Sequence, residues 1–394
     1  MKILYDYQAF EMQEYGGVSK SFCELIKNLP KACTYEIGLK ESNNIHLHNS
    51  NISDSISFNT LDKNQFITRK HFRGKYKLYN ICNKYFNFIP TTYNKNRNYS
   101  IELLKEQNYD IFHPTFFDPY YIKHLKKKPF VLTIHDMIPE LYPEFYKNCD
   151  QISLKKYLAP QASAIIAVSN QTKNDIIKFL NIPEDKITVI YHGCPETTTI
   201  NTQTNRIIDE PYFLYVGTRL AYKNFSLLIK EFEQVVNTNK QIKLVCTGPD
   251  FTQEELLLIK KYNVTDNVIS IRVTDIELGV LYSQAIAFIF PSSYEGFGMP
   301  ILESFSYKCP IILNNASCFP EIAGEAAIYF NETNHYCNLG KQMIKTLNFT
   351  EEERQKQINK GLKQLSFYSW KKSAEKLFQV YSSIVNSSLK ISPA

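Results

Sequence analysis

The sequence lacks the features of a membrane-spanning or exported chain. No uninterrupted apolar run approaches the roughly 20 residues that a membrane-spanning helix needs. The amino-terminal stretch MKILYDYQAF contains no secretory apolar region and no cleavage site. With 394 residues, 44% of them hydrophobic, the chain is long enough for about two or three domains. We therefore expect a folded, soluble protein of the cytoplasm, in contact at most with the inner face of the cytoplasmic membrane.

The cysteine pattern fits neither a disulfide framework nor a zinc site. The nine cysteines are odd in number and scattered, and no two are arranged as C-x-x-C. Disulfide frameworks use even numbers of cysteines, and zinc sites use closely spaced pairs. We expect the thiols to be reduced and mostly buried.

A strong excess of one charge is also missing. The formal charge of +6 is too small and too dispersed for a nucleic-acid-binding protein. Basic residues gather only at residues 69–77, where aromatic residues are interleaved, and at Lys126, Lys127 and Lys128. Such clusters can contact anionic lipid headgroups, at about 1 kcal/mol per basic residue. They can equally form a solvated basic face, and the sequence leaves both interpretations open.

Short apolar stretches alternate with amphipathic ones along most of the chain. A strand at residues 1–7 and a helix at residues 18–29 begin the pattern, which resumes after an irregular region at residues 42–100. A polar segment at residues 195–210 separates this series from a second one that begins at residue 212. This alternation predicts parallel sheets covered by helices. The predicted fold class is therefore α/β, with two Rossmann-like parallel-sheet domains facing each other across a cleft.

The stretch AIAFIFPSSYEGFGMPILESFSYKCPIILN, residues 285–314, carries the most specific signal. It predicts a strand, a glycine loop, a helix entered through Pro300, and a second strand. Gly296 and Gly298 allow the backbone to approach a ligand closely, and the free N–H groups of the helix start can receive a diphosphate. Glu295 and Glu303 would repel phosphates but can accept hydrogen bonds from sugar or ribose hydroxyls. The segment therefore predicts a site for a nucleotide-linked sugar.

Glu295 and Glu303 match the E-x7-E signature of family 4 retaining glycosyltransferases, which have the GT-B fold. Four further segments resemble the same family in the expected order: YGGVS (residues 15–19), TIHD (133–136), YFLYVGTRLAYKN (212–224) and NNASCFPEIAGEAAIYF (314–330). The resemblance covers most of the chain. It implies an acceptor-side domain at residues 1–205, a nucleotide-sugar domain at residues 206–368, and a last helix within residues 369–394 that crosses back to the first domain.

The resemblance also implies roles for individual residues. Arg219 and Lys223 would stabilise the departing diphosphate, Glu295 would contact the donor sugar, and Glu303 would bind the ribose. A glutamate in a first helical turn is also favoured by the helix dipole, so both explanations of Glu303 can hold. The other expected donor contacts are Gly16, Gly17, His135, Arg272, Val273, Gly296, Phe297, Gly298 and Met299. His135 joins Arg219, Lys223 and Glu295 in the expected catalytic set, and His113 and Asp136 are expected on the acceptor side.

The resemblance implies a transfer with retention. We expect no catalytic metal, since the chain contains no Asp-x-Asp, the metal-binding signature of GT-A glycosyltransferases. The segments YGGVS and TIHDMIPE look like those of mannosyltransferases that extend bacterial surface polysaccharides. We expect GDP-mannose as the donor substrate, a glycan or lipid-linked glycan as acceptor, and no cofactor. The alternatives are another donor such as a UDP-hexose or dTDP-rhamnose, a sugar-nucleotide epimerase of similar fold, and a non-catalytic subunit.

Overall fold

The computed structural model describes residues 1–52, 56–57, 92–147, 149–194, 206–333 and 336–391. The basic segment at residues 69–77 lies outside these ranges, as does most of the linker predicted at residues 195–210. Within the described residues, no helix is both long and apolar enough to cross a membrane. Five cysteines are buried thiols outside any disulfide: Cys23, Cys33, Cys246, Cys309 and Cys318.

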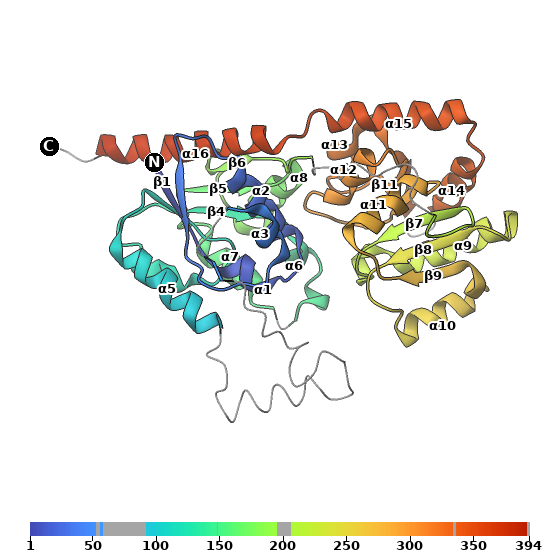
Figure 1. Ribbon diagram of the computed structural model, residues 1–394, viewed down its shortest axis with the longest axis horizontal. Coiled ribbons are helices and arrows are strands. Elements are labelled where there is room, and N and C mark those ends of the chain that lie inside the picture. The colour runs from blue at the N-terminus through green and yellow to red at the C-terminus, as the bar shows by residue number, and fades with distance from the viewer. Residues whose placement is uncertain (53–55, 58–91, 148, 195–205, 334–335, 392–394) are drawn as a thin grey trace, which may run out of the picture.

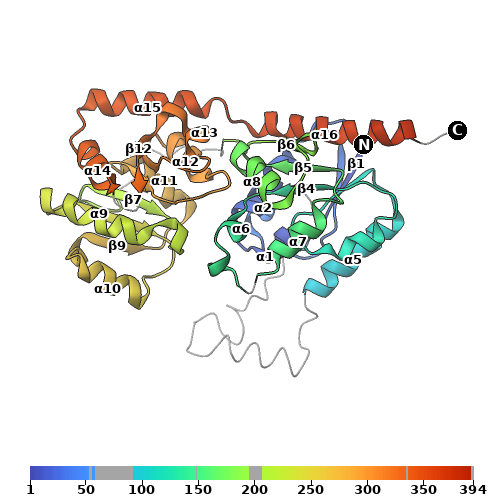
Figure 2. The same cartoon turned by 180° about the vertical axis from the view of Figure 1, so that it is seen from behind.

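The first domain is built on parallel strands in two groups. The first group has the order β2-β1-β3 and the second β4-β5-β6, and a bridge between Phe112 and Phe130 joins them. Helices cover both faces, with α2 and α3 in front in Figure 1 and α7 and α8 in front in Figure 2. The strands are β1 (Lys2–Tyr5), β2 (Thr34–Ile37), β3 (Ile111–His113), β4 (Val131–Ile134), β5 (Ala164–Ala167) and β6 (Ile187–Val189). The helices are α1 (Gln8–Met12), α2 (Gly17–Lys27), α3 (Ile45–Ser50), α5 (Thr92–Glu106), α6 (Ile138–Leu141), α7 (Gln151–Leu158) and α8 (Asn170–Leu180).

The second domain contains one six-stranded parallel sheet in the order β12-β11-β10-β7-β8-β9. Its apolar strands are buried on both faces, as expected for a sheet covered by helices. The strands are β7 (Tyr212–Val216), β8 (Lys243–Thr247), β9 (Val268–Ile271), β10 (Phe288–Phe290), β11 (Ile311–Asn314) and β12 (Ile328–Phe330), with a small hairpin β13 (Glu332–Thr333) and β14 (Tyr336–Cys337). The helices are α9 (Phe225–Thr238), α10 (Gln253–Lys261), α11 (Asp275–Gln284), α12 (Met299–Ser306), α13 (Phe319–Ala323), α14 (Leu339–Leu347) and α15 (Glu351–Leu365).

The last helix, α16 (Trp370–Ile391), runs along the first domain after α15 has crossed the second (Figure 1). Trp370, Leu377 and Tyr381 belong to the buried core of the first domain. The Tyr381 hydroxyl lies 2.9 Å from the hydroxyl of Tyr5 on β1. The chain therefore passes between the domains twice, while the exact boundaries at residues 205 and 368 stay predictions.

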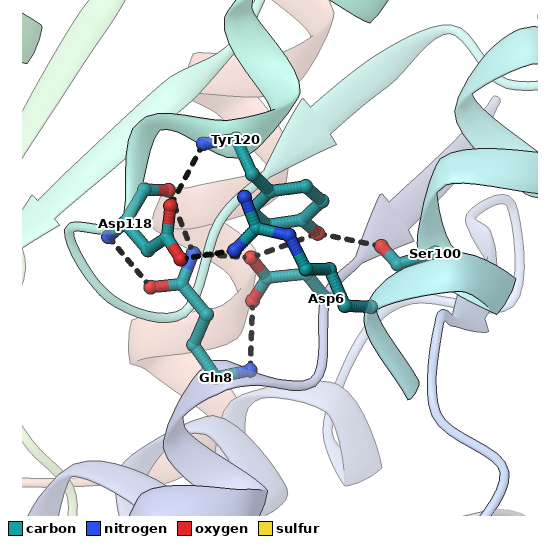
Figure 3. A network of polar contacts seen from close by, with 6 residues as sticks. Asp6, Gln8, Ser100, Asp118 and Tyr120 are labelled. Atoms are coloured by element: carbon teal, nitrogen blue, oxygen red, sulfur yellow. Dashed lines mark hydrogen bonds and ion pairs between the residues drawn. The ribbon is translucent and has the colours of Figure 1, made fainter. Parts of the chain in front are cut away.

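A buried carboxylate organises the carboxyl edge of the first sheet. Asp6 follows β1, is fully buried, and accepts hydrogen bonds from the Thr115 backbone at 2.8 Å and from the Gln8 side chain at 2.6 Å. Figure 3 shows how Tyr120 and Asp118 extend this network. Burial raises the pKa of Asp6, and its hydrogen bonds oppose that shift. The network joins the loop after β1 to the loop after β3, and the loop after β1 leads through α1 to the Gly16–Gly17 turn.

Candidate active site

The glycine loop between β10 and α12 reaches across to the first domain. Gly298 has a φ of +84°, a left-handed conformation that favours glycine. A Cβ on Gly296 would collide with the carbonyl oxygen of His135. Gly296 was expected to admit a ligand, but in this structure it admits the backbone of the opposite domain. The loop is thus a point of direct interdomain contact.

Glu295 and Lys223 form an ion pair in the second domain. Lys223 ends the short 3-10 helix Ala221–Lys223 that follows β7, and Glu295 lies in the glycine loop after β10. The side chain of Lys223 is 19% exposed and that of Glu295 is 12% exposed. Both charged groups are therefore largely shielded from solvent. The neighbouring strands β7 and β10 therefore bring together two residues that the sequence separates widely.

Glu303 on α12 pairs with Lys20 on α2, with 3.1 Å between Nζ and Oε1. Burial, the largest single effect, lowers the pKa of Lys20, but the carboxylates of Glu303, Asp275 and Glu24 together raise it, and the net shift is upward. The contact joins the two domains beside the starts of both helices. Nothing in the spacing of the sequence indicated Lys20, because its partner comes from the other domain.

The amino termini of α2 and α12 lie against each other. Gly16 precedes α2 and Gly17 begins it, while Met299 begins α12. A Cβ on Gly17 would lie 2.6 Å from Met299 Cε. The first N–H groups of a helix have no partner within it, and the helix dipole adds partial positive charge there. Two such ends at one place favour an anion between them.

His135 presents a neutral imidazole to a cavity between the domains. Burial, the largest effect, lowers the pKa of His135 to about 4. Its Nε2 has no hydrogen-bond partner among the residues that the structure describes. The cavity measures about 220 Å³, and its lining includes Asp136 and Lys155 from the first domain and Tyr222 from the second. The expected positions of His135 and Asp136 at this cleft are therefore consistent with a sugar or acceptor contact.

His113 has no free ring atom for an acceptor. It is fully buried, with Nδ1 2.6 Å from the Tyr381 hydroxyl and Nε2 2.8 Å from Thr133 Oγ1. Burial lowers the pKa of His113 to about 3, so the ring is neutral. The acceptor contact expected of His113 stays a prediction, and in this arrangement both ring nitrogens already have partners. Its function is to join β3, β4 and α16.

Arg219 is also placed differently from expectation. Its Nε donates to Glu255 at 2.8 Å, and its Nη2 donates to the carbonyls of Pro249 and Asp250 at 2.6 and 3.0 Å. The side chain is 2% exposed, and within the described part of the chain only Nη1 is left without a partner. Arg219 therefore holds the loop before α10 in place. Its expected contact with the departing diphosphate, suggested by the four-residue spacing from Lys223, stays a prediction.

Of the other donor contacts expected from the sequence, Arg272 lies at the surface of the second domain and Phe297 lies in the domain interface. Arg272 is exposed and pairs with Asp250 at 2.8 Å, and Val273 follows it at the start of the loop before α11. The Phe297 ring is buried and packs edge-on against His192 with 4.8 Å between centroids. Its side chain is therefore committed to the domain interface, and its carbonyl oxygen accepts from Cys318 Sγ at 3.3 Å.

Two family models match adjacent parts of the sequence. One, described as "Glycosyltransferase Family 4", matches residues 62–197, and the other, described as "Glycosyl transferases group 1", matches residues 197–364. The chain belongs to the family 4 glycosyltransferases. The resemblance drawn from Glu295, Glu303 and the four further segments is confirmed.

Two curated relatives of this glycosyltransferase act on O-antigen chains according to their names. The O-antigen chain mannosyltransferase RfbU of Salmonella typhimurium is 30% identical over 51% of this chain and 56% of its own length. The O-antigen chain mannosyltransferase B of Escherichia coli is 26% identical over 69% of this chain and 74% of its own length. The first match thus spans little more than half of the relative.

Solved structures share the fold. Sucrose-phosphate synthase from Thermosynechococcus elongatus matches with a TM-score of 0.71 at 17% identity, over 98% of this chain and 99% of the other. Anabaena HepE in complex with UDP-glucose matches with a TM-score of 0.65 at 15% identity, over 97% and 100%. The expected GT-B fold of this glycosyltransferase is confirmed.

Proposed function

We propose that this glycosyltransferase moves a hexose from a nucleotide sugar to a hydroxyl of a glycan acceptor, with retention and without a metal ion. The observation that carries the proposal is the contact of the α2 and α12 amino termini at Gly17 and Met299. Glu295 and Glu303 lie on either side of Met299 in the sequence, and each is held by a lysine. This arrangement offers dipoles to a diphosphate and carboxylates to the hydroxyl groups on both sides of it.

In the proposed reaction, the acceptor hydroxyl attacks the anomeric carbon from the face on which the diphosphate leaves. The new carbon–oxygen bond forms as the bond to the β-phosphate oxygen breaks, and that oxygen takes the acceptor proton. Lys223 and the backbone N–H groups at Gly298 and Met299 stabilise the growing negative charge. Glu295 and neutral His135 orient the sugar through hydrogen bonds. Arg219 contributes at most through Nη1.

GDP-mannose is the donor that we propose, because two relatives are named as O-antigen chain mannosyltransferases. A UDP-hexose is the second candidate, since HepE has been solved with UDP-glucose. The acceptor that we propose is a growing glycan, free or carried on a lipid. Asp136 and Tyr222, which line the interdomain cavity beside His135, are in position to contact it.

The basic surface of the first domain supports a peripheral membrane contact on the cytoplasmic side. Lys126, Lys127 and Lys128 line an open cavity of about 770 Å³ that Lys186 and one face of α16 complete. This cavity lies before β4, β5 and β6, at the sheet edge opposite the carboxyl ends of those strands. A membrane bound here would leave the cleft accessible to a glycan.

A donor screen tests the function. GDP-mannose, UDP-glucose and dTDP-rhamnose are compared by thermal shift, since a ligand at a hundredfold its Kd stabilises by about 2.7 kcal/mol. The preferred donor is then incubated with excess EDTA, and the anomeric configuration of the product is determined by NMR. Retention and undiminished activity are expected. Activity that disappears and returns with Mg²⁺ or Mn²⁺ contradicts the mechanism, and conversion of the donor to an epimer favours the epimerase.

A vesicle assay tests the membrane contact. Sedimentation with anionic vesicles is expected to fall when Lys126, Lys127 and Lys128 are replaced by alanine. The matched control replaces Lys240, Lys260 and Lys261 of the second domain, which removes the same charge. Equal loss in both variants contradicts a specific surface.

A further inference from the structure

The carbonyl oxygen of Gly296 is held by two hydroxyl groups from the opposite domain. Ser169 Oγ donates to it at 2.6 Å and Thr172 Oγ1 at 3.1 Å. Both side chains are fully buried. Ser169 is also the N-cap of α8, because its Oγ accepts from the Thr172 backbone N–H. One helix start therefore anchors the residue that directly follows Glu295.

The residue that directly precedes Glu295 is anchored to the same helix. The Tyr294 hydroxyl donates to Asp175 Oδ2 at 2.8 Å. Tyr294 and Asp175 are 5% and 6% exposed, and Gln171 donates to the same carboxylate oxygen at 3.0 Å. Asp175 lies six residues after Ser169, which is about 1.7 helical turns. Figure 2 shows α8 on the side of the first domain that faces the second.

We propose that the α8 latch, consisting of Ser169, Thr172 and Asp175, positions Glu295 for the donor sugar and does so only when the domains are closed. These contacts span the two domains, so opening the cleft breaks them together. Glu295 then keeps Lys223 as its partner, but the backbone on both sides of it loses its support. Closure of the two domains thus fixes the position of Glu295, the carboxylate that we expect to contact the sugar.

The three latch residues are positioning residues, because they act through Tyr294 and Gly296 and need not touch the substrates. This inference rests on the proposed function, since Glu295 matters only if a sugar lies beside it. Another interdomain contact at the start of α8 supports the same closed arrangement. Glu321 of α13 accepts from the backbone N–H groups of Asn170 and Gln171 at 2.6 and 3.2 Å.

The test compares latch variants with matched controls that lose similar hydrogen bonds inside one domain. Tyr294→Phe and Ser169→Ala remove latch contacts. Tyr212→Phe removes a buried hydroxyl that donates to Leu281 at 2.8 Å, and Ser304→Ala removes one that donates to Cys309 at 2.8 Å. Thr172→Ser keeps its hydroxyl group and serves as the conservative variant.

Two readouts are measured for each variant. Steady-state kinetics with the preferred donor give kcat and KM, and small-angle scattering with and without GDP or UDP gives the degree of closure. The Tyr294→Phe/Ser169→Ala double variant is expected to lose at least tenfold in kcat and to scatter as a more open particle. Both control variants and Thr172→Ser are expected to keep wild-type kcat and closure.

The outcomes separate the inference from the function on which it rests. A double variant that closes and turns over like the control variants overturns the latch. A wild-type protein that transfers sugar from no donor overturns the proposed function. In that case the scattering comparison still decides whether α8 holds the domains together.

Discussion

The ammonium group of Lys20 lies 3.1 Å from the carboxylate of Glu303 and so links α2 of the first domain to α12 of the second. Because the ribose is expected to bind Glu303, we expect Lys20 to contribute to the donor site although it comes from the opposite domain. Its position in the first turn of α2 also puts a cation near the proposed diphosphate.

We expect Lys20→Ala to raise the KM for the donor about fivefold with little change in melting temperature. The pair is part-exposed, so its loss is worth about 1 kcal/mol, which corresponds to about fivefold in affinity. Steady-state kinetics over a range of donor concentrations measure the effect. Lys31→Ala, an exposed lysine of the same domain, is the control. An unchanged KM would remove Lys20 from the donor site.

Lys223→Ala is expected to lower turnover at least tenfold while the fold stays intact. A charge-assisted contact is worth about 1.5–3 kcal/mol, and one made mainly in the transition state affects kcat. Rapid-quench measurement of the chemical step, together with a melting curve, checks both parts. Turnover close to wild type would show that the departing diphosphate does not depend on Lys223.

Particular residues show how far the sequence could predict the site. The buried apolar strands and the E-x7-E spacing are local features, so they predicted the parallel sheets and the positions of Glu295 and Glu303. Lys20, Ser169 and Asp175 act across the domain interface, and no local spacing reveals such partners. Arg219 shows that spacing alone does not fix a side chain's partners. Its distance from Lys223 in the sequence suggested a shared ligand, but Glu255 and two carbonyls compete for its guanidinium.

Arg219→Ala is therefore expected to destabilise the second domain. Arg219 is 2% exposed and makes three hydrogen bonds, to Glu255 and to two backbone carbonyls, so its removal costs about 3 kcal/mol. Urea unfolding should show a lower midpoint, whereas Lys223→Ala should leave it near wild type. Arg219→Ala with wild-type stability and tenfold lower turnover would restore the original interpretation of Arg219 as part of the diphosphate clamp.

The buried histidines predict that stability falls in mild acid. Burial lowers the pKa of His135 to about 4 and that of His192 to about 3, against about 6.5 in the unfolded chain. Between these values the unfolded chain binds protons that the folded chain does not, so the free energy of unfolding decreases as pH falls from about 6.5. The loss should level off once the pH is below the folded pKa values.

Urea midpoints at pH 7.5, 6.5, 5.5 and 4.5 measure this dependence. Each buried histidine contributes at most about 1.4 kcal/mol per pH unit within its window. His192→Gln should show a shallower decline than wild type, because one of these groups no longer takes up a proton on unfolding. The substitution also removes the ring contacts of His192 with Phe297 and Trp370, and this loss lowers the urea midpoint at every pH. The two proteins are therefore compared by the slope of the midpoint with pH and not by its absolute value. Equal slopes in the two proteins would mean that His192 is not held neutral by burial.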